Sequence, residues 1–375
     1  LISSPEPGPY FERVMDWADS FKRLGVRANA DQKDEAAIAR KLGAKGIGLC
    51  RTEHQFGGPR KNMVAELILL LNVKNPSKAQ AKTMEKLLSK LLDAQREDFM
   101  GVFESMDGLP TTIRLIDPPL HEFLPSDDEL KNLIRKSKTK AEKDKYHQMA
   151  ELKQSLHESN PMLGLRGCRL GILFPIINET QVRAIFEAAS IRKRAGFDPH
   201  PEIMIPLTAD VNELKYLEPI VRGTAEKVMK EKGVKVDYLY GTMIEIPRAA
   251  LTSEEIAEVA EFYSFGTNDL TQTVMGVSRD DTAAMLAEYV EKGILPVDPF
   301  QVIDRRGVGK LMKMCIEDGR KTRPDIKLGI CGEHGGEPES VAFCHSLDLD
   351  YVSCSTYRVP GARLAAAQAA LKDKK

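Results

Sequence analysis

The sequence predicts an α/β protein with a (β/α)8 barrel of the TIM type, and three observations support this prediction. Eight short runs of apolar and β-branched residues, bounded by glycine and other turn residues, recur along the 375 residues. Segments with helical spacing separate these runs. The runs are apolar almost throughout, which is typical of parallel strands buried on both faces. Eight such strands favour closure into a barrel, and an open doubly wound sheet is the alternative.

Strands and helices are expected to alternate along the whole chain. The expected strands cover residues 25–29, 46–50, 111–116, 202–207, 238–246, 261–266, 328–331 and 350–354. The helical segments cover residues 31–42, 84–103, 180–195, 211–232, 252–259, 308–319 and 339–346.

Two of the connections are much longer than the rest. The connection after the second strand has about 60 residues and the one after the third about 85. Charged segments with helical character, 78–96 and 126–159, fill much of both, and such charge runs are usually solvated helical faces. We therefore expect long helical insertions after strands 2 and 3. Residues 1–22 are interpreted as a linker leading into a helix and residues 23–375 as the barrel, in a chain that belongs to a longer protein.

Composition excludes several classes of function. Lysine and arginine total 54 against 55 acidic residues, a formal net charge of −1, so no field favours nucleic acid or an anionic membrane. The six cysteines form no CxxC pair and show no zinc spacing, which indicates reduced thiols. No apolar run approaches the roughly 20 residues of a membrane span, and no signal peptide is recognisable. We expect a cytoplasmic protein, and an organelle stays open because a targeting segment would lie outside this sequence.

Polar residues follow the expected strands at the end where barrel enzymes carry their chemistry. Arg51 follows the second strand, Arg114 lies in the third, and Glu245 lies near the end of the fifth. The sixth strand runs into residues 266–269, and the seventh ends at Cys331. Each of these residues alone has a structural explanation in turn formation. Five strands that end in this way predict one shared site.

Glu245 lies inside an otherwise apolar run, where an unpaired carboxylate would cost several kcal/mol. With Asp269 from the next strand it would form a pair of hard oxygen ligands, which suits Mg²⁺. The alternative is a buried Glu–Arg ion pair. Arg51 and Arg114, together with Arg166 and Arg169, predict a guanidinium cluster that grips phosphoryl or carboxylate oxygens. The site is therefore expected to bind a small, doubly anionic molecule.

Cys331 lies in the glycine-rich stretch KLGICGEHGGE, residues 327–337. Three glycines beside one thiol leave room for a small ligand to approach the sulfur. The alternative is a buried structural cysteine before an ordinary turn. Cations nearby, a metal or His334 would favour the thiolate.

Several motifs carry a family resemblance over essentially the whole chain. They are GLCRTEH (48–54), IRLIDPPLHEFLP (113–125), NPMLGLRGCRLGI (160–172), EIMIP (202–206), GTMIEIPRAALT (241–252), SFGTNDLTQ (264–272), LGICGEHGGEP (328–338) and YVSCSTYRVPGARLAAAQAAL (351–371). They resemble the C-terminal phosphoenolpyruvate (PEP)/pyruvate domain of the pyruvate, phosphate dikinases, within the PEP-utilising enzyme family. The chain is similar more loosely to PEP synthases and to enzyme I of the sugar phosphotransferase system.

The resemblance implies a barrel that binds pyruvate or PEP with Mg²⁺ and exchanges a phosphoryl group with a phosphohistidine. In the family the overall reaction converts ATP, phosphate and pyruvate into AMP, diphosphate and PEP. The family's ATP-grasp and phosphohistidine domains precede this one, and nothing in this sequence matches either. A homodimer is also implied.

The resemblance also assigns roles to residues. Arg51 and Arg114 would bind the phosphoryl group, Cys331 would be the proton donor, and Glu245 and Asp269 would be the metal ligands. The other matched positions are Gly266, Thr267 and Asn268 in the substrate loop and Arg166 as a further arginine. His334 receives no firm role. Two other hypotheses stay open, a Mg²⁺-dependent barrel that cleaves a carbon–carbon bond through the pyruvate enolate, and a non-catalytic dimerising scaffold.

Overall fold

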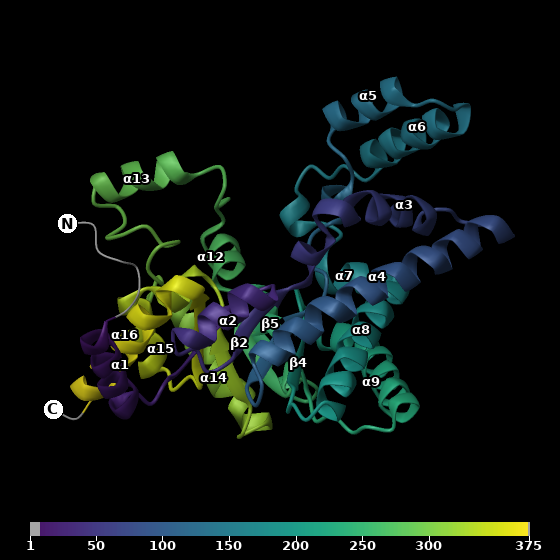
Figure 1. The fold of residues 1–375 in the computed structure, drawn as a ribbon. Coiled ribbons are helices and arrows are strands. Elements are labelled where there is room, and N and C mark those ends of the chain that lie inside the picture. Colours follow the sequence, from purple (N-terminus) through teal and green to yellow (C-terminus); the bar gives the residue numbers. More distant parts are fainter. Residues whose placement is uncertain (1–7, 374–375) are drawn as a thin grey trace.

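A computed structural model describes residues 8–373 of the chain and shows a closed barrel of eight parallel strands in the order β1 to β8 (Figure 1). The strands are β1 (Gly25–Asn29), β2 (Ile47–Arg51), β3 (Pro110–Arg114), β4 (His200–Ile205), β5 (Leu239–Ile244), β6 (Phe262–Phe265), β7 (Lys327–Ile330) and β8 (Tyr351–Ser355). Pairing of β1 with β8, from Gly25 opposite Tyr351 to Asn29 opposite Ser355, closes the ring. The barrel prediction is confirmed.

Helices surround the barrel and build its insertions. The α-helices are α1 (Pro9–Phe21), α2 (Lys33–Lys41), α3 (Lys61–Leu71), α4 (Lys78–Ser105), α5 (Asp127–Lys136), α6 (Lys140–Ser155), α7 (Gly167–Leu173), α8 (Pro175–Arg194), α9 (Val211–Lys232), α10 (Pro247–Leu251), α11 (Ser253–Ile256), α12 (Thr267–Met275), α13 (Ala283–Glu291), α14 (Val308–Thr322), α15 (Pro338–Ser346) and α16 (Val359–Lys372). Short 3-10 helices are η1 (Thr52–Phe56), η2 (Gly58–Arg60), η3 (Leu120–Phe123), η4 (Pro161–Leu163), η5 (Glu333–Gly336) and η6 (Thr356–Arg358).

The long insertions after strands 2 and 3 are present as expected. They contain α3 and α4, then α5 and α6, whose apolar faces pack into a cluster of their own around residues such as Val64, Leu91 and Leu120. Serine or threonine side chains cap α4, α5 and α6 at Ser77, Ser126 and Thr139, which explains where these charged helices begin. In Figure 1, α5 and α6 rise on one side of the barrel and α13 rises on the other.

Some boundaries differ from the sequence prediction. The expected strand 111–116 ends at Arg114, because Leu115 and Ile116 lead into the turn before Pro118. The expected helix 252–259 is shortened to α11, and the separate helix α10 precedes it across Thr252. Helix α16 was not expected, although it is rich in alanine, the best helix former. Of the expected N-terminal segment, residues 9–21 form α1, and residues 1–7 lie outside the described part of the chain.

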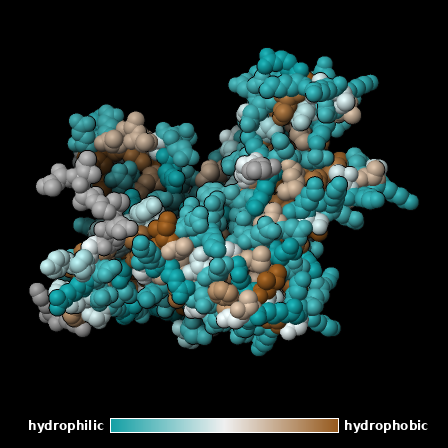
Figure 2. All heavy atoms as spheres, in the orientation of Figure 1, coloured by the Kyte–Doolittle hydropathy of each residue, from teal (hydrophilic) through white to brown (hydrophobic). Residues whose placement is uncertain are grey.

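The barrel interior combines an apolar layer with a buried polar one. Leu49, Met204, Met243 and Phe262 pack beside Cys331. The guanidinium of Arg27 donates to the carboxylate of Glu202 at 2.7 Å and 3.3 Å. The face shown in Figure 2 is mostly hydrophilic, with scattered apolar residues. No helix in the described residues 8–373 combines the length and the apolar character that crossing a membrane requires.

Candidate active site

A cavity of about 320 Å³ lies at the carboxyl ends of the barrel strands, a volume suited to a small ligand. The structure brings eight of the nine residues proposed from the sequence to its wall. They are Arg51, Arg114, Arg166, Glu245, Gly266, Asn268, Asp269 and Cys331. Thr267 is fully buried behind the wall, and its hydroxyl lies 2.7 Å from Nδ1 of His334. Arg169 does not line the cavity, because its guanidinium donates to the carbonyls of Leu163 and Gly164.

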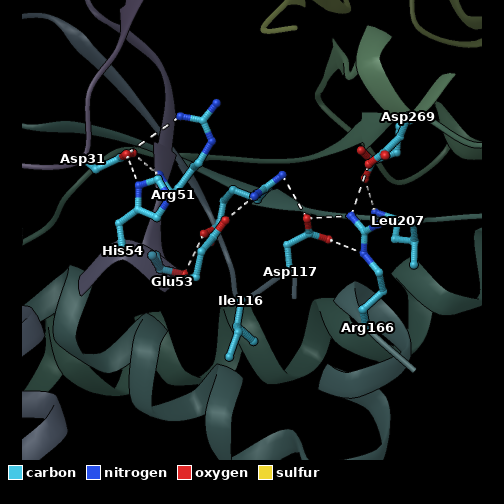
Figure 3. A network of polar contacts seen from close by, with 12 residues as sticks. Asp31, Arg51, Glu53, His54, Ile116, Asp117, Arg166, Leu207 and Asp269 are labelled. Carbon is cyan, nitrogen blue, oxygen red and sulfur yellow. Dashed lines mark hydrogen bonds and ion pairs between the residues drawn. The ribbon is translucent and has the colours of Figure 1, made fainter. Parts of the chain in front are cut away.

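Alternating carboxylates and guanidinium groups run along one side of the cavity (Figure 3). Arg114 donates to Glu53, and its Nη1 lies 3.1 Å from Oδ2 of Asp117. Nη2 of Arg166 donates to the same Asp117 oxygen at 2.7 Å and to Oδ2 of Asp269 at 3.2 Å. These carboxylates raise the pKa of both arginines against the opposing effect of burial. Both guanidinium groups therefore stay charged in place.

The backbone around Arg166 explains how it reaches the site. Gly167 follows it with φ of 57°, and its amide donates to the carbonyl of Asp117 at 2.8 Å. A side chain at Gly167 would lie 2.7 Å from Cβ of Leu207, so only glycine fits this left-handed position against β4. This turn fixes Arg166 at the start of α7, directly beside Asp117.

Glu245 is 1 % exposed and follows β5. Its Oε1 accepts a 2.6 Å hydrogen bond from the amide of Leu207. Burial, and then the carboxylates of Asp269 and Asp117, raise the pKa of Glu245 well above its ordinary value. In the described part of the chain, no arginine or lysine forms an ion pair with Glu245 within 4.0 Å, so the alternative of a buried Glu–Arg pair is not supported.

The charge of the cavity wall favours a cation. Its acidic residues are Asp117, Glu122, Glu245, Asp269, Asp280 and Glu333, and its basic residues are Arg51, Arg114, Arg166 and Arg279. Carboxylates thus outnumber guanidinium groups, although an anionic ligand is expected. Within residues 8–373, no group of three or more His, Cys, Asp or Glu side chains is arranged to hold a metal ion. A metal at Glu245 and Asp269 would therefore need further oxygens from water or ligand, as Mg²⁺ commonly does.

Cys331 lies at the end of β7 and is 3 % exposed. Its amide donates to the carbonyl of Phe265 at 3.2 Å. Its carbonyl accepts from Nδ2 of Asn29 at 3.1 Å. Burial raises the pKa of the Cys331 thiol to about 11, although Ser264 and Arg114 act in the opposite direction. Burial therefore outweighs the nearby cations, which on their own would favour the thiolate, and the protonated thiol is the resting form.

His334 has a structural role. Its Nδ1 lies 2.7 Å from Oγ1 of Thr267, and its Nε2 lies 2.9 Å from the carbonyl of Pro299. Burial lowers the pKa of His334, so the ring is neutral and donates to Pro299 through Nε2. It joins η5, α12 and the segment of residues 276–307, and both ring nitrogens are engaged away from the thiol.

Arg51 is the most loosely held of the three predicted arginines that line the cavity. Its amide donates to Oδ1 of Asp31 at 2.6 Å, whereas Nη1 lies 3.8 Å from Oδ2 of that residue. Nδ1 of His54 lies 2.6 Å from the same Oδ2 atom. Figure 3 shows Asp31 between the two side chains.

Sequence reasoning missed part of the wall. Arg279 and Asp280 reach the cavity from the loop after α12, and Glu333 reaches it from η5. Glu333 lies in the glycine-rich stretch 327–337 but received no role, and the only local signal for Arg279 and Asp280 was the charged run RDD at residues 279–281. A loop of this composition is usually a solvated turn, so its contribution depends on how the segment 276–307 folds back over the barrel.

Comparison with known proteins shows the family of the chain. A family model described as "PEP-utilising enzyme, PEP-binding domain" matches residues 8–371. The chain is 52% identical over 370 residues to pyruvate, phosphate dikinase 1, chloroplastic, of Arabidopsis thaliana, covering 98% of this chain and 37% of that protein. It is 49% identical over 373 residues to pyruvate, phosphate dikinase of Giardia intestinalis, covering 99% and 41%.

A bacterial relative gives the same result. Pyruvate, phosphate dikinase of Clostridium symbiosum is 49% identical over 368 residues, which cover 97% of this chain and 40% of that protein. The chain spans about two fifths of the length of these curated relatives. Identity of about half over nearly the whole chain is far above what a shared barrel alone produces, since barrels host many unrelated functions. The chain therefore belongs to the PEP-utilising enzyme family and matches its PEP-binding domain.

Proposed function

We propose that residues 23–375 form the catalytic PEP/pyruvate domain of a pyruvate, phosphate dikinase. The domain would move a phosphoryl group between a phosphohistidine, carried by another domain, and the enolate oxygen of pyruvate. The observation that carries this proposal is the wall of one cavity, where Glu245 and Asp269, three predicted arginines and a buried thiol meet. The names of the relatives support the same reaction.

The residues fit Mg²⁺ as the cofactor. Glu245 and Asp269 are hard oxygen donors, and burial, followed by the charge of Asp269, raises the pKa of Glu245. A divalent cation between them would remove that repulsion. When bound, Mg²⁺ would supply positive charge that favours the enolate form of pyruvate.

The arginines would act on the phosphoryl group and the carboxylate. Arg51 and Arg114 face the cavity from β2 and β3, and planar guanidinium forks can each grip two phosphoryl oxygens. Phosphoryl transfer depends mainly on how the reactants are positioned and on electrostatic stabilisation of the phosphoryl oxygens. The arginine side chains would supply the positive charge. Arg166 and Arg279 would help to hold the substrate carboxylate.

Cys331 would exchange the proton at the methyl carbon. In the direction of pyruvate formation, the bond between phosphorus and the enol oxygen breaks as the phosphoryl group moves to the histidine. The thiol then gives its proton to C3 of the enolate, leaving a thiolate that water reprotonates. A thiol whose pKa is raised to about 11 by burial is in the correct form to donate.

Exchange of the methyl protons of pyruvate with deuterium tests this proposal. We expect exchange in heavy water that requires Mg²⁺ and is lost in Cys331→Ala, while pyruvate still binds that variant by calorimetry. Binding without exchange in the unaltered chain, at saturating Mg²⁺, would indicate the scaffold hypothesis instead. Release of pyruvate from a longer keto acid would favour carbon–carbon bond cleavage.

Other parts of the proposal concern the whole protein. The overall reaction with ATP and phosphate, docking of a phosphohistidine domain and homodimerisation are proposed from the relatives' names and the resemblance of the motifs. A PEP synthase type of enzyme is the closest alternative, and dependence on phosphate would distinguish the two. We propose a cytoplasmic or organellar location, since several relatives are named chloroplastic.

A further inference from the structure

We propose that His54 is a positioning residue for Arg51, and that it sets how strongly Asp31 competes with the substrate's phosphoryl group for the Arg51 guanidinium. This inference rests on the proposed function, because it takes the phosphoryl group of PEP as the ligand of Arg51. The ligand chemistry is a phosphate monoester dianion. Ligands that lack this group should not respond to His54.

One oxygen atom serves two cationic side chains. Oδ2 of Asp31 lies 2.6 Å from Nδ1 of His54 and 3.8 Å from Nη1 of Arg51. The short contact is a full hydrogen bond, and the longer one is an ion pair without a hydrogen bond. His54 therefore holds the better position on the shared oxygen, and Arg51 is held loosely.

Asp31 contacts Arg51 from outside the cavity wall. Its side chain is 10% exposed and is not part of the cavity wall, whereas Arg51 lines the cavity and is 27% exposed. Oδ1 of Asp31 accepts the amide of Arg51 at 2.6 Å, so the carboxylate cannot move away from the arginine. A ligand that recruits the guanidinium must draw it from Asp31.

The charge of His54 decides how negative Asp31 remains. When the imidazole is protonated, it neutralises Asp31 and leaves Arg51 free to turn toward an anion in the cavity. When the imidazole is neutral, the uncompensated carboxylate attracts Arg51 more strongly. The other charged groups that act on the ring are Glu53 and Arg51, and Glu53 is already engaged by Arg114.

The imidazole of His54 can change its charge with pH. The hydrogen bond to Asp31 raises the pKa of His54 above its ordinary value, against the opposing effects of burial and of Arg51. The side chain is 56% exposed, so protons and buffer reach it. The charged form of His54 therefore persists to higher pH than in an unpaired histidine.

The experiment compares His54→Gln with the unaltered chain by calorimetry across pH 6 to 9, with PEP and with pyruvate, both with Mg²⁺. We expect PEP to bind the variant about two- to fivefold more weakly at pH 6, the range of a partly exposed ion pair, and equally at pH 9. Pyruvate should bind both proteins equally at every pH. The ratio of the two proteins cancels the ionisation of PEP itself.

Two controls separate positioning from a general effect. His147→Gln removes an exposed histidine on α6 and should change neither ligand. In an Asp31→Asn background, which keeps an oxygen for the Arg51 amide, His54→Gln should have no further effect on PEP. A loss of affinity that is equal for PEP and pyruvate, independent of pH, or unchanged in the Asp31→Asn background would overturn the inference.

A second measurement does not need a ligand. NMR titration of the His54 ring should show its pKa lowered in Asp31→Asn and raised in Arg51→Gln. An unchanged titration in Arg51→Gln would show that the two side chains do not share Asp31, and the inference would fail even if PEP binds. Absence of PEP binding to the unaltered chain, with the titrations as expected, would instead refute the proposed function and leave the coupling of the three side chains established.

Discussion

Nη2 of Arg166 lies 3.2 Å from Oδ2 of Asp269. One of the two carboxylates proposed to hold the metal is therefore paired with an arginine, which also donates to Asp117 at 2.7 Å. The guanidinium and a metal ion would both be attracted to Asp269, and each would repel the other. Arg166 thus favours an anionic ligand while it opposes binding of the metal alone.

Replacing Arg166 should separate these two effects. In Arg166→Gln we expect Mg²⁺ alone to bind about tenfold more tightly, the order expected when one nearby positive charge is removed. PEP with Mg²⁺ should bind more weakly, because a carboxylate or phosphoryl partner is lost. Calorimetry measures both constants. Arg169→Gln is the matched control, because its guanidinium donates to the carbonyls of Leu163 and Gly164 and does not line the cavity. Weaker Mg²⁺ binding in Arg166→Gln would contradict this account.

Glu245 should make stability depend on pH in a metal-free protein. Its folded-state pKa is raised by burial, Asp269 and Asp117, so it contributes stability below its ordinary pKa of 4.5 that is lost as pH rises through the folded value. We expect metal-free Glu245→Gln to melt at a higher temperature than the unaltered chain at neutral pH, and the difference to shrink as pH falls toward 5. Mg²⁺ should stabilise only the unaltered chain. Thermal melts with and without chelator test this expectation.

The barrel was predictable from the sequence because each strand has a recognisable sequence pattern. Strands buried on both faces are apolar runs that end at turn residues, and the expected range 25–29 has the same limits as β1. Helices were harder, because α12 begins inside the polar stretch after Gly266 and its apolar face is short. The long charged insertions were visible as helical, but nothing local showed that α3 to α6 pack into a cluster separate from the barrel.

The candidate site was predictable only where residues follow strands. Glu245, Arg114 and Cys331 are fixed by strand geometry, and a parallel barrel brings such positions to one end. Arg279 and the Asp31–His54 contact come from loops, whose paths depend on tertiary packing. Protonation states could not be predicted from the sequence either. The pKa of the Cys331 thiol depends on how deeply it is buried, and burial is a property of the assembled barrel.

His334 should hold the segment 276–307 against the barrel. It donates to the carbonyl of Pro299 and accepts from Thr267, and the contact with Thr267 needs the neutral ring. In His334→Phe we expect faster hydrogen exchange in residues 277–305, because the link to Pro299 is lost. Binding of PEP should weaken with it, since Arg279 belongs to that segment.

His334 should also make the stability of this segment depend on pH. Burial lowers its folded-state pKa, so its contribution to stability is present above 6.5 and is lost as pH falls through the folded value. Acid should therefore speed exchange in residues 277–305 of the unaltered chain and have little effect there in His334→Phe. His147→Gln, far from this segment on α6, should behave like the unaltered chain. Equal acid sensitivity in both proteins would show that His334 does not fasten the segment.

Glu202 should be the main source of acid sensitivity in the barrel interior. It is 2 % exposed and accepts hydrogen bonds from Arg27, Thr112 and Lys327. Burial acts to raise its pKa, but Arg27 and Lys327 outweigh burial and lower the pKa from 4.5 to about 2. Its contribution is therefore present above pH 4.5 and is lost as pH falls toward 2, and this shift corresponds to about 3 kcal/mol.

Two substitutions separate the ion pair from the packing around it. Glu202→Gln leaves Arg27, which is 5% exposed, without its carboxylate, so we expect the free energy of unfolding at pH 7 to fall by about 3–5 kcal/mol. Adding Arg27→Met should recover part of this loss, since no unpaired charge is then buried. Urea unfolding followed by circular dichroism at pH 7 and at pH 3 measures both effects. The Glu202→Gln protein should lose less stability between these two pH values than the unaltered chain, and an equal loss would mean that other carboxylates govern acid unfolding.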